Sequence, residues 1–201
     1  EDNTCTNTDV CCETDGDCND GDDVCTNDLC INDFCYFQPT GAAGCCIPEV
    51  VSYDFEDGSL AQWVIENGQT SYNWRIGTIQ TFGGSDNSLY YGSVLETGYG
   101  PSINAAIVSK DWILLPAAEE LMLELELRYN VESCCDDASL YLVTETSEVF
   151  LAEFNGNSSG WVHRSYDISQ YTGQNVKLKF TFHSDSSVQY EGVWIDNVGI
   201  H

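Results

Sequence analysis

Hydrophobic and polar residues alternate along much of the chain after residue 50. In the segment LMLELELRY (121–129), Leu occupies every second position up to a final Tyr, and Met, Glu or Arg stand between. Residues 176–183 repeat the pattern, with Val, Leu and Phe alternating with Lys, Thr and His. A period of two places one face of a strand in a core and the other in water. Both segments are therefore predicted to be half-buried β-strands.

Further strands are predicted at residues 138–145, 149–154 and 161–168. Turn signals separate them, namely Asn155-Gly156-Asn157, Ser159-Gly160 and Thr172-Gly173. No stretch shows a helical period. Roughly nine or ten strands at this spacing are typical of two packed antiparallel sheets. The predicted fold class is all-β, an antiparallel jelly-roll β-sandwich.

One carboxylate interrupts the last predicted strand. Asp196 stands between apolar residues in the segment WIDNV (194–198). A buried carboxylate needs a partner, and the segment DFEDG (54–58) interrupts an earlier strand in a similar way. Two such strands lying side by side could hold a hard cation. This pattern favours a sandwich stabilised by calcium.

The first 46 residues differ in composition from the rest. They hold nine of the eleven cysteines and no Lys or Arg. So few residues could fill a core that disulfides must hold this part. We predict a small acidic, disulfide-rich module at residues 1–48 and the sandwich at residues 49–201. The disulfide candidates are Cys5, Cys11, Cys12, Cys18, Cys25, Cys30, Cys35, Cys45, Cys46, Cys134 and Cys135.

Metal binding is an alternative interpretation of this segment. Zinc sites usually show CxxC pairs, and the chain has none. Asp15, Asp17 and Asn19 are spaced as in an EF-hand, but Asp20 stands where the loop needs Gly. The EF-hand interpretation therefore fails, while a looser calcium loop stays open.

The chain is strongly acidic, with a net charge of −27 and six Lys plus Arg residues. Such a field repels nucleic acid and anionic membranes, so neither is expected as a partner. It attracts cations, although the acidity could equally serve solubility or a saline habitat. No apolar run is long enough to cross a bilayer. With the disulfides, this predicts a secreted, extracellular or cell-surface chain whose signal peptide has been removed.

Catalytic motifs are absent from the sequence. There is neither an HExxH helix motif nor a Gly-x-Ser-x-Gly elbow, and we predict that the chain is not an enzyme. Four aromatic residues outside the alternating runs are candidates for stacking on sugars. Placement in the core is the alternative, and we prefer it for the two tryptophans. The four are Trp74, Tyr91, Tyr99 and Trp112.

Four segments together resemble MAM-like jelly-roll modules of bacterial secreted proteins. Such modules include cleaved-adhesin modules and the non-catalytic C-terminal part of immune-inhibitor-type metalloproteases. The resemblance covers about residues 50–200. Its segments are YDFEDGSLAQW (53–63), SDNSLYYGS (85–93), SGWVHRSYDISQYTGQNVKLKF (159–180) and SDSSVQYEGVWIDNVGI (184–200).

The resemblance implies a jelly roll without catalytic residues, and in many members of the wider group one structural calcium. Glu56 and Asp196 would then be calcium ligands, with Asp86 a weaker candidate. Backbone carbonyls near Asp57 and Asp86 would complete the coordination shell.

One departure from the family pattern concerns the cysteines. The family continues from its central strand through an acidic turn, and here Cys134-Cys135 stands in that turn before Asp136-Asp137. We therefore predict a disulfide from Cys134 or Cys135 to residues 1–46.

Two functions are compatible with these features. The first is a non-catalytic structural or adhesive subunit that binds copies of itself and forms a fibre or surface coat, stabilised by calcium and disulfides. Sheet edges suit repeated contacts of this kind. The alternative is a carbohydrate-binding accessory module of a secreted protein, with a glycan or surface protein as partner.

Overall fold

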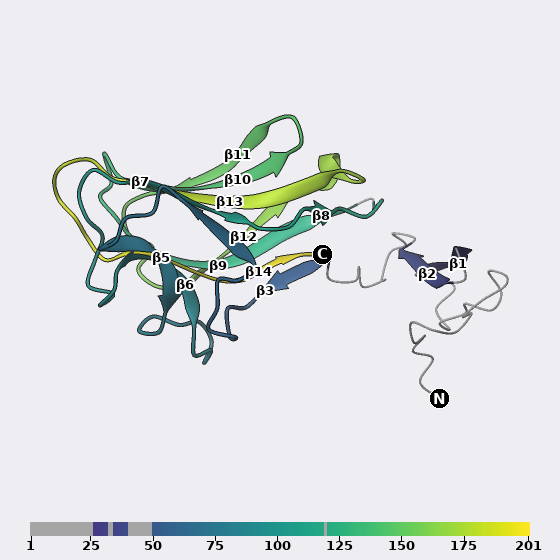
Figure 1. Cartoon of the computed structure of the whole chain (residues 1–201), viewed down its shortest axis with the longest axis horizontal. Coiled ribbons are helices and arrows are strands. Elements are labelled where there is room, and N and C mark those ends of the chain that lie inside the picture. Colours follow the sequence, from purple (N-terminus) through teal and green to yellow (C-terminus); the bar gives the residue numbers. More distant parts are fainter. Residues whose placement is uncertain (1–25, 32–33, 40–49, 119) are drawn as a thin grey trace. The chain divides into compact units, whose positions relative to one another are not determined.

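The computed structural model describes residues 26–31, 34–39, 50–118 and 120–201. From residue 50 onward it contains two antiparallel six-stranded sheets that pack face to face (Figure 1). In spatial order, the first sheet consists of β11 (Glu148–Phe154), β10 (Asp137–Thr144), β13 (Asn175–His183), β7 (Asn104–Ser109) and β4 (Trp63–Glu66), and β8 (Ile113–Leu114) also pairs with β13.

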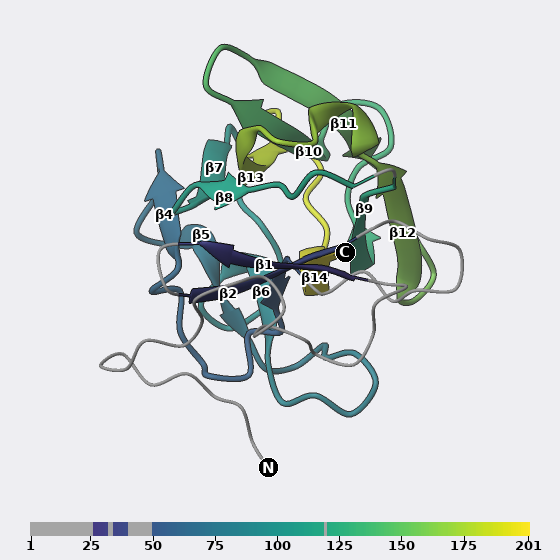
Figure 2. The same ribbon diagram turned by 90° about the vertical axis from the view of Figure 1, so that its right-hand side faces the viewer.

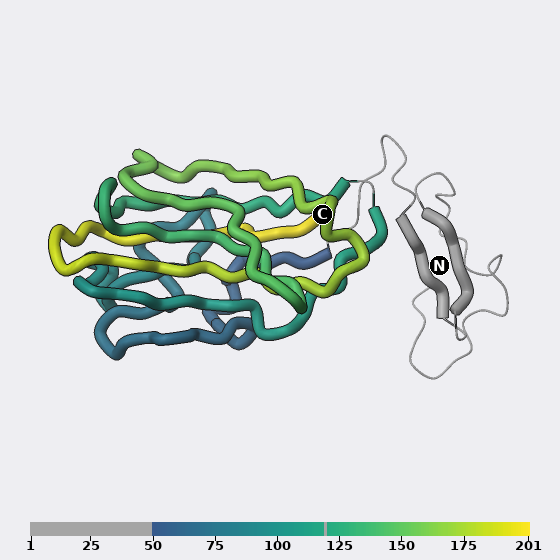
Figure 3. The backbone as a smooth tube through the Cα atoms, turned by 90° about the horizontal axis from the view of Figure 1, so that it is seen from above, coloured from purple at the N-terminus to yellow at the C-terminus, as the bar shows by residue number. Residues whose placement is uncertain are grey.

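The second sheet contains the first and the last strand of the sandwich in sequence. Its spatial order is β12 (Val162–Asp167), β9 (Met122–Asn130), β14 (Gly192–Ile200), β6 (Ser88–Ser93) and β5 (Tyr72–Gly77), and β3 (Val51–Tyr53) also pairs with β14. Figure 2 shows β14, β9 and β6 in one layer and β10, β13 and β7 in the other. Neighbouring strands run side by side along the sandwich (Figure 3). Strands far apart in sequence are thus neighbours, as a jelly roll requires.

The predicted fold class is confirmed for this part of the chain. The strands expected at 121–129, 138–145, 149–154, 161–168 and 176–183 correspond to β9, β10, β11, β12 and β13, with ends shifted by one residue. One short 3-10 helix, η2 (Ser169–Tyr171), lies among them. None of the helical segments in the described residues is long and apolar enough to cross a membrane.

The disulfide-rich module is described only in part. Two strands, β1 (Thr26–Ile31) and β2 (Phe34–Pro39), pair antiparallel. The chain divides into two compact units, and the sandwich unit comprises residues 49–116 and 121–201. The domain boundary after residue 48 stays a prediction.

The core lies between the two sheets and follows the alternation of the sequence. On β13, Val176, Leu178, Phe180 and Phe182 are buried and the residues between them are partly exposed. Aromatic rings from the second sheet meet these side chains. The Tyr91 ring stacks on Phe182 with centroids 4.3 Å apart, and Trp74 lies 6.3 Å from Phe180. These contacts join the two sheets.

Phe180→Ala should therefore destabilise the sandwich strongly. Its side chain is 1% exposed and also lies 5.9 Å from the ring of Trp63. Loss of a buried Phe costs about 3–5 kcal/mol because it removes transfer free energy and leaves a cavity. Urea denaturation should show this loss. Phe150→Ala in the same sheet is the matched control, since Phe150 is 54% exposed, and equal losses in the two variants would contradict the assignment of the core.

Candidate functional site

The carboxylate of Glu56 holds a loop that lies between β5 and β6. Its Oε2 accepts a hydrogen bond from the backbone N of Asp86, and its Oε1 accepts one from the backbone N of Asn87, both at 3.0 Å. The Asn87 side chain returns a longer bond of 3.4 Å to the Glu56 carbonyl oxygen. Glu56 thus fixes residues 86 and 87 from a position just after β3.

Asp196 on β14 contacts the same loop, on the side of the second sheet that faces away from the first sheet. It is 0% exposed. Its Oδ2 accepts a hydrogen bond from Ser85 Oγ at 3.0 Å, and its Oδ1 accepts one from the Asn197 backbone N at 2.8 Å. Burial raises the pKa of Asp196, these hydrogen bonds oppose the shift, and the nearby charge of Glu56 adds to it. The structure therefore brings Glu56 and Asp196 together around residues 85–87.

The backbone is unusual on both sides of this pair. Phe55 has φ of 58° and Asn197 has φ of 46°. Asn tolerates the left-handed region, whereas Phe rarely adopts it. The pairing of β14 with β9 also shifts register between Asp196 and Gly199. Strained backbone persists only where the surrounding structure compensates its energetic cost, and such positions are enriched at binding sites.

The donor set suits a hard cation. None of the ion pairs among the described residues involves Glu56 or Asp196. Two adjacent carboxylates, one of them buried, therefore have no basic partner there. Calcium is bound by carboxylate and carbonyl oxygens, and when bound it would neutralise this pair.

Asp57 and Asp86 take different positions from the other two candidates. The Asp57 carboxylate accepts a hydrogen bond from the backbone N of Ser59 at 2.9 Å and so closes its own turn. Asp86 contributes its backbone N to Glu56, and its side chain is exposed. A direct role of either carboxylate in metal binding stays a prediction.

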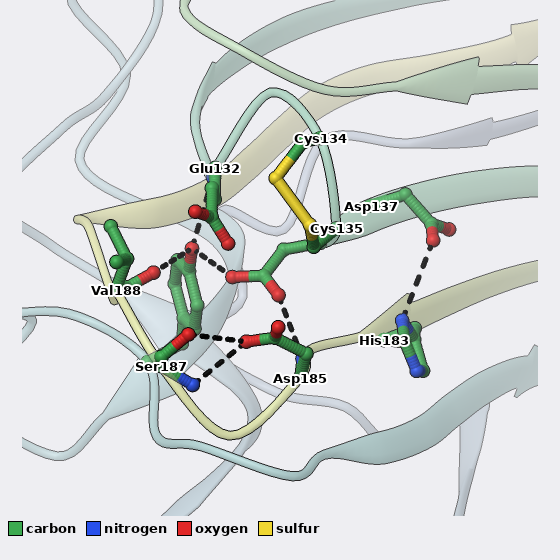
Figure 4. Close-up of a disulfide and its surroundings, with 10 residues drawn as sticks. Glu132, Cys134, Cys135, Asp137, His183, Asp185, Ser187 and Val188 are labelled. Atoms are coloured by element: carbon green, nitrogen blue, oxygen red, sulfur yellow. Dashed lines mark hydrogen bonds and ion pairs between the residues drawn. A yellow bond between two sulfur atoms is a disulfide. The ribbon is translucent and has the colours of Figure 1, made fainter.

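The prediction for the cysteine pair was wrong. Cys134 and Cys135 form a disulfide with each other in the turn between β9 and β10 (Figure 4). A sulfur bonded to its neighbour has no valence left for a bridge to residues 1–46. The side chains of the other nine cysteines lie outside the described residues.

Three of the four sugar-stacking candidates belong to the core. Trp74 is 1% exposed, Tyr91 0% and Tyr99 3%, so no ligand can stack on them. The core placement preferred for Trp74 holds, but the same preference for Trp112 was wrong, because its side chain is 48% exposed. Trp112 lies between β7 and β8, and Lys177 Nζ stands 5.2 Å from the centroid of its ring.

A row of exposed and partly exposed side chains crosses the first sheet near Trp112. Strand register aligns Phe150 with Tyr141, Tyr141 with Lys179, Lys179 with Val108, and Val108 with Val64. Tyr141 and Lys179 are partly exposed, whereas their neighbours along the strands point into the core. We call Phe150, Tyr141, Lys179, Val108 and Val64, together with Lys177 and Trp112, the outer face.

Contacts within the outer face order its side chains. The rings of Tyr141 and Phe150 meet edge to face with centroids 5.6 Å apart. Lys179 Nζ lies 2.8 Å from Glu148 Oε1 and 3.9 Å from Glu66 Oε2. Sequence reasoning missed Tyr141 and Phe150. Alternation along β10 places Tyr141 away from the core. Alternation along β11 would place Phe150 on the face of the buried Phe154, but the pairing of β10 with β11 shifts register at Leu140 and Tyr141, and Phe150 is exposed.

Parts of secreted bacterial proteases are similar to this chain in sequence, although no family model matches it. The chain is 27% identical to Bacillopeptidase F of Bacillus subtilis over 147 residues, which are 72% of the chain and 10% of that protein. It is 29% identical to Immune inhibitor A of Bacillus thuringiensis over 82 residues, which are 36% of the chain and 12% of that protein. The matches thus span only about a tenth of these relatives.

Solved structures show the same fold. The K1 cleaved adhesin domain of Lys-gingipain from Porphyromonas gingivalis matches with a TM-score of 0.53 and 15% identity, covering 75% of this chain and 96% of that domain. The resemblance to cleaved-adhesin-type jelly-roll modules is confirmed. The carbohydrate-binding module CBM27-1 of Caldicellulosiruptor saccharolyticus, solved with mannohexaose, matches with a TM-score of 0.54 and 12% identity, covering 77% of this chain and 97% of that module.

The cysteine assignment can be checked by mass spectrometry. Digestion without reduction should release a peptide that contains Cys134 and Cys135 and is lighter by two hydrogens than its reduced form. Because both sulfurs are used, no fragment should join this peptide to residues 1–46. Recovery of a fragment that links Cys134 or Cys135 to residues 1–46 would contradict the assignment.

Proposed function

We propose that this chain is a non-catalytic, glycan-binding accessory module of an extracellular protein, and that it binds its ligand on the outer face of the first sheet. The observation that carries the proposal is the row of exposed and partly exposed aromatic, aliphatic and lysine side chains on this face. Flat rings with an apolar body suit stacking on sugar rings. Lys177, Lys179 and the carboxylates beside Lys179 are polar groups that can bind hydroxyls.

The comparisons support an accessory role. The relatives are bacterial proteases that this chain matches over a small fraction of their length. The structural neighbours are an adhesin domain and a carbohydrate-binding module. A module beside a catalytic domain would hold the enzyme near a glycan-rich surface. Self-assembly into a fibre or surface coat stays a prediction.

The outer face can be tested with defined glycans. Isothermal titration calorimetry with mannohexaose, xylan and β-1,4-galactan should find at least one ligand. Trp112→Ala and Phe150→Ala should each weaken its binding about tenfold, equivalent to about 1.4 kcal/mol. Both side chains are about half exposed, so their melting temperatures should stay close to that of the unaltered protein.

Ile79→Ala is the matched control, because Ile79 is 61% exposed and is not part of the outer face. It should bind the glycan like the unaltered protein. The proposed location of the site would be refuted if none of the three glycans bound. It would also be refuted if Trp112→Ala and Phe150→Ala bound the glycan as tightly as the unaltered protein.

We propose in addition that Glu56 and Asp196 hold a structural calcium ion. The proposal is supported by the missing basic partner, the burial of Asp196 and the strained backbone around the pair. Calcium at a hundred times its dissociation constant stabilises a protein by about 2.7 kcal/mol, which for a chain of this size corresponds to about 5–10 °C in melting temperature.

Scanning calorimetry with calcium and with excess chelator tests this second proposal. The melting temperature should fall in chelator, and Glu56→Gln should lose much of the calcium response. Glu153→Gln, an exposed position on β11, should keep the full response. A melting temperature that does not change in chelator would show that calcium has no structural role here.

A further inference from the structure

A second group of carboxylates lies beside the Cys134–Cys135 disulfide. Glu132 and Asp136 belong to the turn between β9 and β10, and Asp185 belongs to the loop between β13 and β14. One oxygen from each of the three lies within 4.8 Å of the others. Figure 4 shows the side chains of Glu132 and Asp185 directed to the same region next to the disulfide. Two separate loops therefore converge on one point.

The protein holds these groups in place with direct contacts. Asp136 is 2% exposed, and its two oxygens accept hydrogen bonds from Tyr99 Oη at 2.5 Å and from the Asp185 backbone N at 2.7 Å. Tyr99 Oη in turn accepts a bond from the Glu132 backbone N at 3.1 Å. Asp185 Oδ1 accepts a bond from the backbone N of Ser187. The carboxylates of Asp136 and Asp185 are thus positioned by hydrogen bonds, and Tyr99 positions the backbone of Glu132.

One oxygen in the group has no hydrogen-bond partner in the part of the chain that the structure describes. Glu132 Oε2 is shielded from solvent and accepts no hydrogen bond from the described residues. A shielded carboxylate oxygen without a partner costs free energy, and the cost grows when other carboxylates face it. A cation bound between the three groups would remove both penalties.

The described part of the chain places no paired basic side chain at this point. Among the residues that the structure describes, none of the ion pairs includes Glu132, Asp136 or Asp185. His183 ends the strand that precedes Asp185, but its ring faces Asp137 at 3.7 Å and is half exposed.

We propose that Glu132, Asp136 and Asp185 form a binding site for a divalent cation, with calcium as the best chemical match. Calcium binds oxygens at about 2.3–2.6 Å, so oxygens on opposite sides of one ion lie up to about 5 Å apart. The spacing of the three oxygens fits this limit, and water would supply the remaining ligands. Zinc is disfavoured because Cys134 and Cys135 are bonded to each other and offer no thiolate.

This cation would join the two loops in which its ligands lie. Neither loop shares a residue with the Glu56–Asp196 pair, so the two sites can be tested separately. The disulfide beside the site restricts the turn that carries Glu132 and Asp136, which helps to preorganise two of the three ligands. The effect expected from occupancy is a stiffer connection between β9–β10 and β13–β14.

Calorimetric titration of calcium into chelator-treated full-length protein tests the proposal. Glu132→Gln and Asp185→Asn should each remove one equivalent of bound calcium, or weaken it at least tenfold, compared with the unaltered protein. Asp136 is left intact, because it also holds Tyr99. Glu153→Gln is the matched control and should bind as the unaltered protein does.

Glu56→Gln separates this site from the first one. If both sites exist, Glu56→Gln and Glu132→Gln each lose a different equivalent, and the double variant loses both. If Glu56→Gln loses an equivalent while Glu132→Gln and Asp185→Asn titrate like the unaltered protein, the second site is refuted and the first one stands. Near-ultraviolet circular dichroism should confirm that each variant is folded.

Discussion

The closing strand β14 sets the main constraint on this sandwich, because almost every side chain on it is buried and one of them is an ionisable carboxylate. Eight of its nine residues are buried, and Asp196 is among them. The strand pairs with β9, β6 and β3, so it ties the start of the sandwich to its centre. A buried carboxylate at this position must be compensated. Ser85 and the backbone of Asn197 provide part of that compensation, and Glu56 brings a second negative charge close by.

The sheets were predictable because the alternation of residues reports burial directly. On β9 and β13, the Leu, Val and Phe side chains are buried and the residues between them are partly exposed, so the pattern and the structure agree. Tyr90 and Tyr91 show a strand on which alternation does not report burial. They are neighbours on β6 and point to opposite faces, yet both are fully buried, since Tyr90 stacks on Trp194 and Tyr91 on Phe182. A strand covered on both sides carries no alternation.

For the candidate site, the local pattern singled out the buried Asp196, whereas Glu56 was predicted as its partner from the segment DFEDG (54–58) and from the family resemblance. Asp196 stands out because its neighbours along the chain are apolar. The contact of Glu56 with residues 86 and 87 joins positions 30 and 31 residues apart, and no local pattern encodes such a contact. Two adjacent cysteines are likewise ambiguous in sequence, because each can bond its neighbour or a distant thiol. The group formed by Glu132, Asp136 and Asp185 depends on two loops meeting, which only the folded structure reveals.

The pairing of β3 with β14 also determines how the sandwich responds to tension. The backbone N of Val50 donates to the Ile200 carbonyl oxygen at 2.7 Å, and the ladder continues from Val51–Ile200 to Tyr53–Val198. The two chain segments that enter and leave the sandwich therefore lie next to each other. A force that pulls Val50 away from Ile200 acts on the hydrogen bonds of this ladder one at a time, starting at the Val50 end. It does not load all of them at once. Anchored through these two points, the module would open first where β3 pairs with β14.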